Sequence, residues 1–173
     1  MDYQNKTISG SILFIGSIIY LLGTVLGEKF SIVTFYNITL YNASTALLGV
    51  LMLIGVYFIY SAFKSPIFSG LIAVAGIGTV GVGLLTYAST EYYIFAGLGY
   101  IFFGLSAIMS YRFEKAPLSF LSIILGVAAL IAFGLWVGKV DLGSGMTVTP
   151  IVIDTLILLW LAGFSAHIIG DNT

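Results

Sequence analysis

Long stretches of this sequence contain no acidic or basic residue. Four of them, each with twenty or more mostly apolar residues, cover residues 7–27, 65–90, 92–111 and 116–138. A helix needs about 20 residues to cross the hydrocarbon core of a bilayer, which is roughly 30 Å thick. Each stretch is therefore long enough to span a membrane, and the chain is predicted to be an integral membrane protein.

The overall composition excludes an ordinary soluble protein. Hydrophobic residues make up 60% of the 173 residues, charged residues make up 8%, and the mean hydropathy is +1.13, whereas soluble domains carry about 25% charged residues. The net charge of −1 gives no basis for nucleic-acid binding. The chain has no Cys and a single His, which leaves no ligand set for haem or another metal. We therefore predict no cofactor and no metal.

The apolar segments predict an all-α polytopic membrane protein, with one six-helix transmembrane bundle over residues 1–173. The expected spans are residues 8–26, 43–63, 67–87, 92–111, 118–137 and 151–169. Pro66, Pro117 and Pro150 each stand at the start of a span, where the missing N–H of proline would have no helical partner. The first segment lacks a convincing cleavage site, so we expect a retained span rather than a signal peptide.

Six spans place both termini on the same side of the membrane. That side carries four of the six basic residues, Lys6, Lys64, Arg112 and Lys115. The positive-inside rule therefore predicts cytoplasmic termini in a multi-pass protein of the cell membrane. Asn37 and Asn42 begin two glycosylation sequons in the first loop, which this topology places outside.

Small residues recur at helical spacing and predict close packing between helices. In a membrane, small side chains allow helix backbones to approach each other closely. The expected packing positions are Gly16, Gly23, Gly27, Ala75, Thr79, Gly83, Gly97, Gly104 and Gly163. The span 67–87 has small residues on several faces, and we expect it in the middle of the bundle.

Asp154 and His167 are the two ionisable groups, apart from tyrosines, within the predicted spans. A charge in the hydrocarbon costs about 2.5–3.5 kcal/mol on insertion scales, so both are functional candidates. Structural interpretations are favoured for both. Asp154 follows Pro150 closely enough to lie at the interface near a helix N-terminus, and His167 shares a stripe with Trp160 and fits a packing histidine. Thirteen residues separate the two groups, about 20 Å along one helix, so they cannot meet.

The external side of the predicted topology holds three acidic residues, Glu28, Glu91 and Asp141. Together they could line a shallow polar site, but charges gather at span ends in any such protein, and this simpler interpretation is favoured. Tyr41 and other tyrosines near span ends fit an interfacial aromatic belt. Hydroxyls within the spans, such as those of Tyr20 and Tyr100, do not form a proton path without further carriers.

Several short motifs follow one another in the chain. They are Gly81-Val82-Gly83, Pro117-Leu118, Ile124-Leu125-Gly126, Leu142-Gly143-Ser144-Gly145-Met146 and Leu158-Leu159-Trp160. Their order resembles a widespread family of small six-span prokaryotic and archaeal membrane proteins, catalogued as domain of unknown function 998. The resemblance implies the six-span fold and no established activity.

The chain departs from this family pattern at two polar positions. Glu91-Tyr92-Tyr93 stands where the family has a His, and Thr147-Val148 stands where the family has a Glu-Arg pair. If those polar residues form a site in the family, this chain lacks it.

Three hypotheses for function stay open. The small-residue faces, the few intramembrane polar groups and the short loops favour a non-catalytic subunit or scaffold. Such a protein would pack against membrane lipids and other integral membrane proteins, as an accessory subunit of a larger complex. The first alternative is a small transporter or permease for a lipid-like or weakly polar solute, with a cavity near His167 or beside the span 67–87. The second is an intramembrane enzyme acting on lipid or quinone, with Glu91, Asp154 and His167 as its acid or base groups.

Overall fold

Six α-helices make up most of the chain that the structure describes. The computed structural model describes residues 2–30, 39–85, 89–140 and 150–170. The helices are α1 (Asp2–Phe30), α2 (Leu40–Phe63), α3 (Pro66–Leu84), α4 (Thr90–Ser110), α5 (Leu118–Val137) and α6 (Pro150–Gly170). No β-strand occurs in these residues. The predicted all-α, six-helix class is confirmed.

Each of the six helices is long and apolar enough to cross a membrane. The shortest is α3, whose 19 residues reach about 28 Å at 1.5 Å per residue, close to the thickness of the hydrocarbon core. α1 extends beyond the predicted span 8–26 at both ends, because its polar terminal turns keep their backbone hydrogen bonds by staying helical. α3 ends three residues before the predicted boundary, because the backbone of Leu85 is extended, with φ −101° and ψ 153°.

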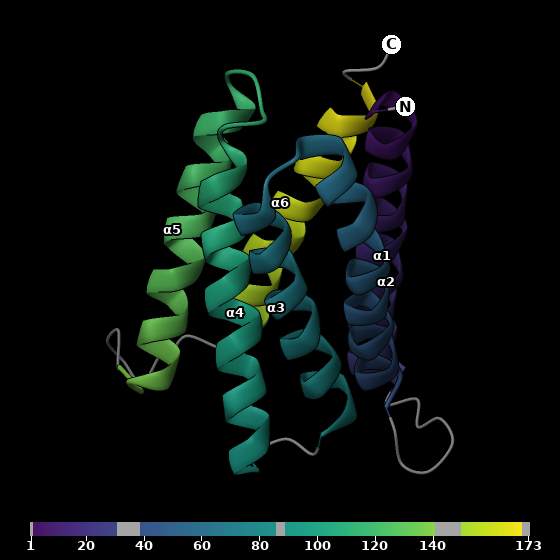
Figure 1. Ribbon diagram of the computed structural model, residues 1–173. Helices are drawn as coiled ribbons and strands as arrows, with labels where there is room; N and C mark the ends of the chain where they lie inside the picture. The colour runs from purple at the N-terminus through teal and green to yellow at the C-terminus, as the bar shows by residue number, and fades with distance from the viewer. Residues whose placement is uncertain (1, 31–38, 86–88, 141–149, 171–173) are drawn as a thin grey trace.

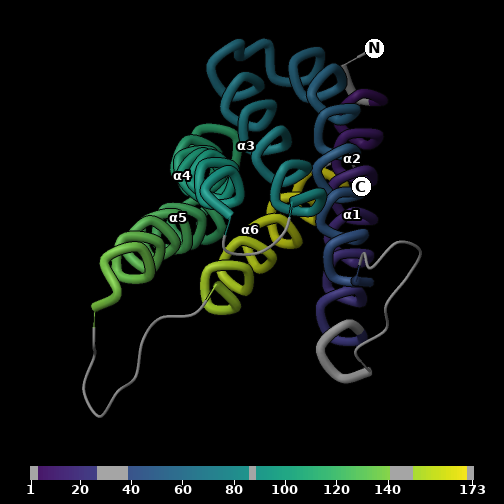
Figure 2. The backbone as a smooth tube through the Cα atoms, turned by 90° about the horizontal axis from the view of Figure 1, so that it is seen from below, coloured from purple at the N-terminus to yellow at the C-terminus, as the bar shows by residue number. Residues whose placement is uncertain are grey.

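The helices form a ring in chain order. Each helix packs against the next one along the chain, α6 returns to pack against α1, and α4 also touches α6 across the ring. Both termini lie at one end of the bundle, together with the α2–α3 and α4–α5 connections (Figure 1). Seen along the bundle, α5 lies at the outside, next to α4 (Figure 2).

The position of α3 differs from the expected one. The sequence predicts α3 in the middle of the bundle, whereas the structure places it in the ring between α2 and α4. Its small residues pack against the two neighbouring helices of the ring. Gly76 and Gly83 face α2, and Gly78 faces α4.

Side-chain caps set the first residue of three helices. The hydroxyls of Thr39, Ser65 and Ser89 precede α2, α3 and α4. Each accepts a hydrogen bond from the backbone N–H three residues later, at 3.1, 3.3 and 3.1 Å respectively. These N–H groups have no partner inside their helix, so the caps satisfy donors that would otherwise be orphaned. At the end of α2, Lys64 adopts the left-handed conformation, with φ 51°.

Glycine brings neighbouring helix backbones into contact around the ring. A Cβ atom on Gly78 of α3 would lie 2.7 Å from the Cα of Gly99 on α4. A Cβ atom on Gly126 of α5 would lie 2.6 Å from the carbonyl oxygen of Gly104 on α4. Because lipid tails are as apolar as leucine, helices in a membrane associate through such close packing rather than through hydrophobic burial.

Most predicted packing positions lie at buried places or against a neighbouring helix. Those that the structure describes in this way are Gly16, Gly23, Ala75, Thr79, Gly83, Gly97 and Gly104. Gly163 packs against no other helix in the described part of the chain, because a Cβ atom there would meet nothing within 4 Å. The surroundings of Gly27 lie outside the described residues.

We predict opposite outcomes for two glycine-to-alanine substitutions. Gly78→Ala places a methyl group against the backbone of Gly99 and should lower stability by about 1–3 kcal/mol, as overpacking does. Gly134→Ala on α5 meets nothing within 4 Å and should leave stability unchanged or slightly raised, because alanine is the better helix former. Thermal unfolding of the purified variants in detergent measures both. Equal melting temperatures for the two would contradict the close α3–α4 contact.

Candidate functional site

A small cavity lies inside the bundle, between all the helices except α5. It is lined by Tyr20 of α1, Tyr41, Thr45 and Leu48 of α2, Thr79 and Val82 of α3, Ala96, Gly99, Tyr100 and Phe103 of α4, and Asp154 and Ile157 of α6. About 30 Å³ is open to the centres of water-sized molecules, which is room for one or two waters or for an ion of that size. The cavity therefore suits a very small ligand.

Asp154 forms the acidic wall of this cavity. Its side chain is 7% exposed, and its Oδ2 accepts a hydrogen bond from the Tyr41 hydroxyl at 3.3 Å. Tyr20 and Tyr100 also lie close enough to interact electrostatically with the carboxylate. The rings of Tyr20 and Tyr41 are tilted against each other with centroids 6.0 Å apart. Asp154 thus faces a group of tyrosines from three other helices.

The surroundings of Asp154 add to the interpretation favoured from the sequence. That interpretation placed Asp154 at the membrane interface near the N-terminus of its helix. Asp154 does lie one turn into α6, which begins at Pro150, and its side chain is buried against α1, α2 and α4. The reason is the closure of the ring, which turns this face of α6 inward.

Two threonines complete the polar part of the lining. Thr45 donates its hydroxyl hydrogen to the Tyr41 carbonyl oxygen at 2.8 Å, and Thr79 donates to the Ala75 carbonyl oxygen at 2.8 Å. A hydroxyl whose hydrogen is committed in this way presents only lone pairs to its surroundings. The lining thus offers oxygen acceptors, a carboxylate and aromatic rings, which are the groups that bind cations.

A second carboxylate, half-buried, lies at the end of the bundle that holds the termini. Glu114 stands in the connection between α4 and α5, outside the spans. Its Oε1 accepts a hydrogen bond from the Ser122 hydroxyl at 2.8 Å. Ser110 Oγ lies 3.4 Å from the same oxygen, while the Ser110 hydroxyl donates to the Ala107 carbonyl oxygen at 2.8 Å. The indole N–H of Trp160 donates to Ser110 Oγ at 3.0 Å. Glu114 is thereby joined to α4, α5 and α6.

Burial raises the pKa of Glu114 above its usual range. The hydrogen bond from Ser122 and the charge of His167 act in the opposite direction, because both favour the ionised carboxylate. Burial prevails, and the other oxygen, Oε2, is buried with no hydrogen-bond partner in the described part of the chain. Glu114 was not among the sequence candidates, since it lies in a loop beside Arg112 and Lys115 and reads as a surface charge.

The remaining predicted residues do not join either carboxylate in a single site. Glu91 is exposed in the first turn of α4. His167 is half-buried near the end of α6 and near Glu114, whereas Asp154 lies near the start of that helix. Asn37 and Asp141 fall outside the described residues, as does the side chain of Glu28.

The sequon at Asn42 lies inside a helix rather than in a loop. α2 begins at Leu40, so Asn42 belongs to its first turn, where its Oδ1 accepts a hydrogen bond from the Thr39 hydroxyl at 2.7 Å. The third residue of this sequon, Ser44, is buried against Gly23 of α1. Both features make Asn42 a poor acceptor for glycosylation, because an acceptor sequon must be accessible in a surface loop.

Within the described residues, no three His, Asp or Glu side chains are grouped so as to hold a metal ion.

Comparison of the chain with protein-family models, with curated proteins and with solved structures finds no match in any of the three. The resemblance to the six-span family therefore stays a prediction, and the site has to be interpreted from its own chemistry.

We predict that Glu114→Gln makes the protein more stable at neutral pH. Because the pKa of Glu114 is raised in the folded state, the folded protein binds the proton more tightly than the unfolded chain. Wild-type stability therefore falls as pH rises from the ordinary glutamate pKa, about 4.3, through the raised value. The Glu114→Gln variant lacks this loss and should melt a few degrees higher at neutral pH.

Melting temperatures across this pH range measure the effect, with exposed Glu91→Gln as the matched control. The curves of Glu114→Gln and the wild type should converge at acidic pH, where Glu114 is protonated in both the folded and the unfolded state. A difference that persists unchanged at acidic pH would contradict the role of burial.

Proposed function

We propose that this protein is a small permease that binds a water-sized monovalent cation at Asp154. The observation that supports the proposal is the cavity inside the bundle, where a buried carboxylate meets tyrosine rings and hydroxyl oxygens. The coarser statement, that the chain is a six-helix multi-pass membrane protein, rests on the helices themselves. The proposal adds to that architecture a bound cation and its transport across the membrane.

The size and charge of the cavity define the ligand class. Moving an ion from water into the membrane removes its hydration shell, so the protein has to supply oxygen atoms in its place. Asp154 supplies the balancing charge, while Thr45 and Thr79 supply hydroxyl lone pairs. One carboxylate balances one positive charge, and the room available fits a dehydrated alkali ion or ammonium rather than an organic solute. The lining rings of Tyr20, Tyr41 and Tyr100 add a favourable cation–π contribution.

This proposal favours transport over the two other hypotheses drawn from the sequence, with a small cation in place of the lipid-like or weakly polar solute expected there. The scaffold hypothesis relied on the scarcity of intramembrane polar groups, but the fold gathers several of those groups around one cavity. The enzyme hypothesis needs Glu91, Asp154 and His167 within reach of one substrate. Glu91 is exposed while Asp154 is buried, and about 20 Å of helix separates Asp154 from His167.

We predict that small monovalent cations stabilise the wild-type protein and that Asp154→Asn removes this effect. A ligand at 100 times its Kd stabilises the folded state by about 2.7 kcal/mol, which shifts the melting temperature by about 2–4 °C per kcal/mol for a chain of this size. The measurement is thermal unfolding in detergent during titration with the chlorides of sodium, potassium and ammonium. Choline chloride at equal ionic strength is the reference, because choline is too large for the cavity.

Asparagine keeps the size of Asp154, removes its charge and replaces one acceptor oxygen with an NH2 donor, so Asp154→Asn tests the carboxylate without opening a cavity. Glu91→Gln removes an exposed carboxylate from α4 and should leave the cation effect intact. The binding proposal fails if the wild type gains no stability beyond that seen in choline, or if Asp154→Asn keeps the full gain.

A second candidate function is that of an accessory subunit in a larger membrane complex. The observation that favours it is the open face of Gly163, where a Cβ atom would meet nothing within 4 Å. Such a position lets a helix of another integral membrane protein approach the α6 backbone closely. The two candidate functions are compatible, because this face of α6 lies outside the cavity lining.

We predict that Gly163→Leu disrupts such a complex. The tagged wild-type chain, extracted from its own membranes in mild detergent, should then carry a partner in stoichiometric amount, and the variant should lose it. Gly134→Leu on α5 is the control, since a Cβ atom there also meets nothing within 4 Å and the position lies on another helix. A wild-type chain that elutes without a partner rules out this second function.

A further inference from the structure

We infer that Glu114 is a second cation site, in series with Asp154, on the route from the cavity to the end of the bundle that holds the termini. This inference rests on the proposed permease function and assigns a role to the second carboxylate. It follows from a series of contacts that leads from the cavity lining to Glu114, from the chemistry of Glu114, and from the charges around it.

The first step of this series leads from the cavity to Trp160. Phe103 lines the cavity and packs edge-on against Trp160, with ring centroids 6.2 Å apart and an interplanar angle of 78°. Trp160 is 2% exposed and lies six residues after Asp154 on α6, about 9 Å along the helix axis. The two rings therefore separate the cavity from the next polar group.

The second step leads from Trp160 to Glu114. The indole N–H of Trp160 donates to Ser110 Oγ at 3.0 Å, and the Ser110 hydroxyl lies 3.4 Å from Glu114 Oε1. A movement of the indole away from Phe103 would also change its hydrogen bond to Ser110. Trp160 thus contacts the cavity lining through Phe103 and the surroundings of Glu114 through Ser110.

Glu114 has one oxygen available for a ligand. Its Oε1 accepts a hydrogen bond from Ser122, whereas Oε2 is buried with no hydrogen-bond partner in the described part of the chain. A buried carboxylate oxygen without a donor is costly. A bound proton or a bound cation would give this oxygen a partner. Because burial raises the pKa of Glu114, the proton competes with a cation for the carboxylate.

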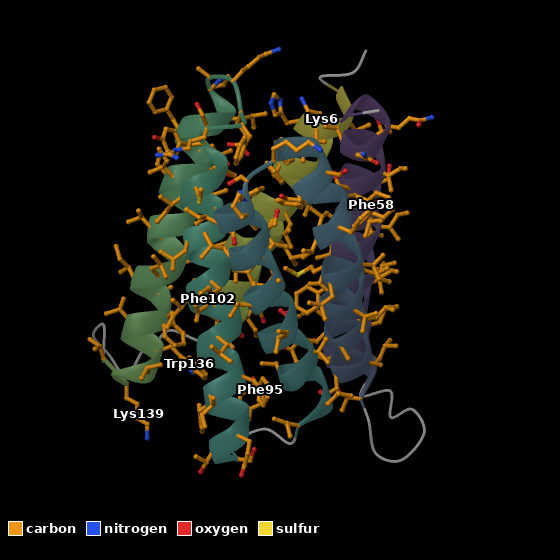
Figure 3. The ribbon with its side chains drawn as sticks, viewed as in Figure 1. Lys6, Phe58, Phe95, Phe102, Trp136 and Lys139 are labelled. Carbon is orange, nitrogen blue, oxygen red and sulfur yellow. The ribbon has the colours of Figure 1, made fainter. Side chains whose placement is uncertain are left out.

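The surrounding charges explain why a second acidic site is needed at this end. The described side chains there include Lys6, Lys64, Arg112, Lys115 and the half-buried His167, all basic. Lys6 projects near this end of the bundle (Figure 3), with its Nζ 5.8 Å from the Phe63 ring centroid. A cation moving toward such a surface meets repulsion unless a nearby carboxylate offsets it, and Glu114 is the acidic side chain that the structure describes there.

The test uses the full-length protein in liposomes, with tracer sodium, rubidium and methylammonium as probes of uptake. Wild type, Asp154→Asn, Glu114→Gln and the control Glu91→Gln are compared. The thermal-unfolding titration with the three cations described above is repeated on each. We expect Glu114→Gln to keep cation-dependent stabilisation, because the Asp154 site is intact, and to lose uptake to the level of protein-free liposomes. Asp154→Asn should lose both.

Each other outcome overturns the inference in a distinguishable way. Unchanged uptake by Glu114→Gln removes Glu114 from the route and leaves the permease function standing. Loss of cation-dependent stabilisation in Glu114→Gln makes Glu114 part of the first site or of the fold. A wild type that shows neither stabilisation nor uptake removes the proposed function itself, and the second site with it. Should Glu114→Gln fail to fold, Glu114→Met takes its place, because it keeps the length of the side chain and removes the carboxylate, and wild-type uptake by that variant would also count against the site.

Discussion

The interior of a bilayer offers no water to hydrogen-bond, so every polar group within it needs a partner in the protein. Helices meet this demand for the backbone. Hydroxyls inside the spans meet it by donating to a carbonyl one turn earlier, as Ser17 does to Leu13 at 2.8 Å and Thr79 does to Ala75 at 2.8 Å. A carboxylate beyond the first turn of a helix has no such local solution, because the backbone donors there are already paired within the helix. Carboxylates withdrawn from water therefore require a tertiary arrangement, and the structure builds one around Asp154 and another around Glu114.

The ring of helices is what makes room for the first arrangement. Contacts through glycine, such as those of Gly78 with Gly99 and of Gly104 with Gly126, hold neighbouring backbones close together. The larger side chains of Asp154 and of the tyrosines that line the cavity then lie in the interior of the ring, not at the contacts between neighbouring helices. Small residues between neighbouring helices and larger ones in the interior thus give both the close helix packing and the small polar cavity.

The two carboxylates differ in the surroundings that the fold gives them. Asp154 lies among tyrosine hydroxyls and rings in the bundle interior, whereas Glu114 lies at the end of the bundle among serine hydroxyls, with His167 nearby. Trp160 lies between them and contacts both groups of residues, through the Phe103 ring and through Ser110. The proposed route from Asp154 to Glu114 rests on this alternation of polar, aromatic and polar groups.

The sequence alone determined the all-α class and the approximate extent of six apolar helices, because hydrophobicity and length are properties of each segment by itself. It also identified Asp154 as a candidate. It did not place Asp154 in a cavity, since Tyr20, Tyr41 and Tyr100 come from three different helices and meet only when the ring closes. Nor did it distinguish Glu114 from its charged neighbours. Which loop carboxylate is drawn away from water depends on where α5 and α6 pack against the end of α4, and only the tertiary structure decides that.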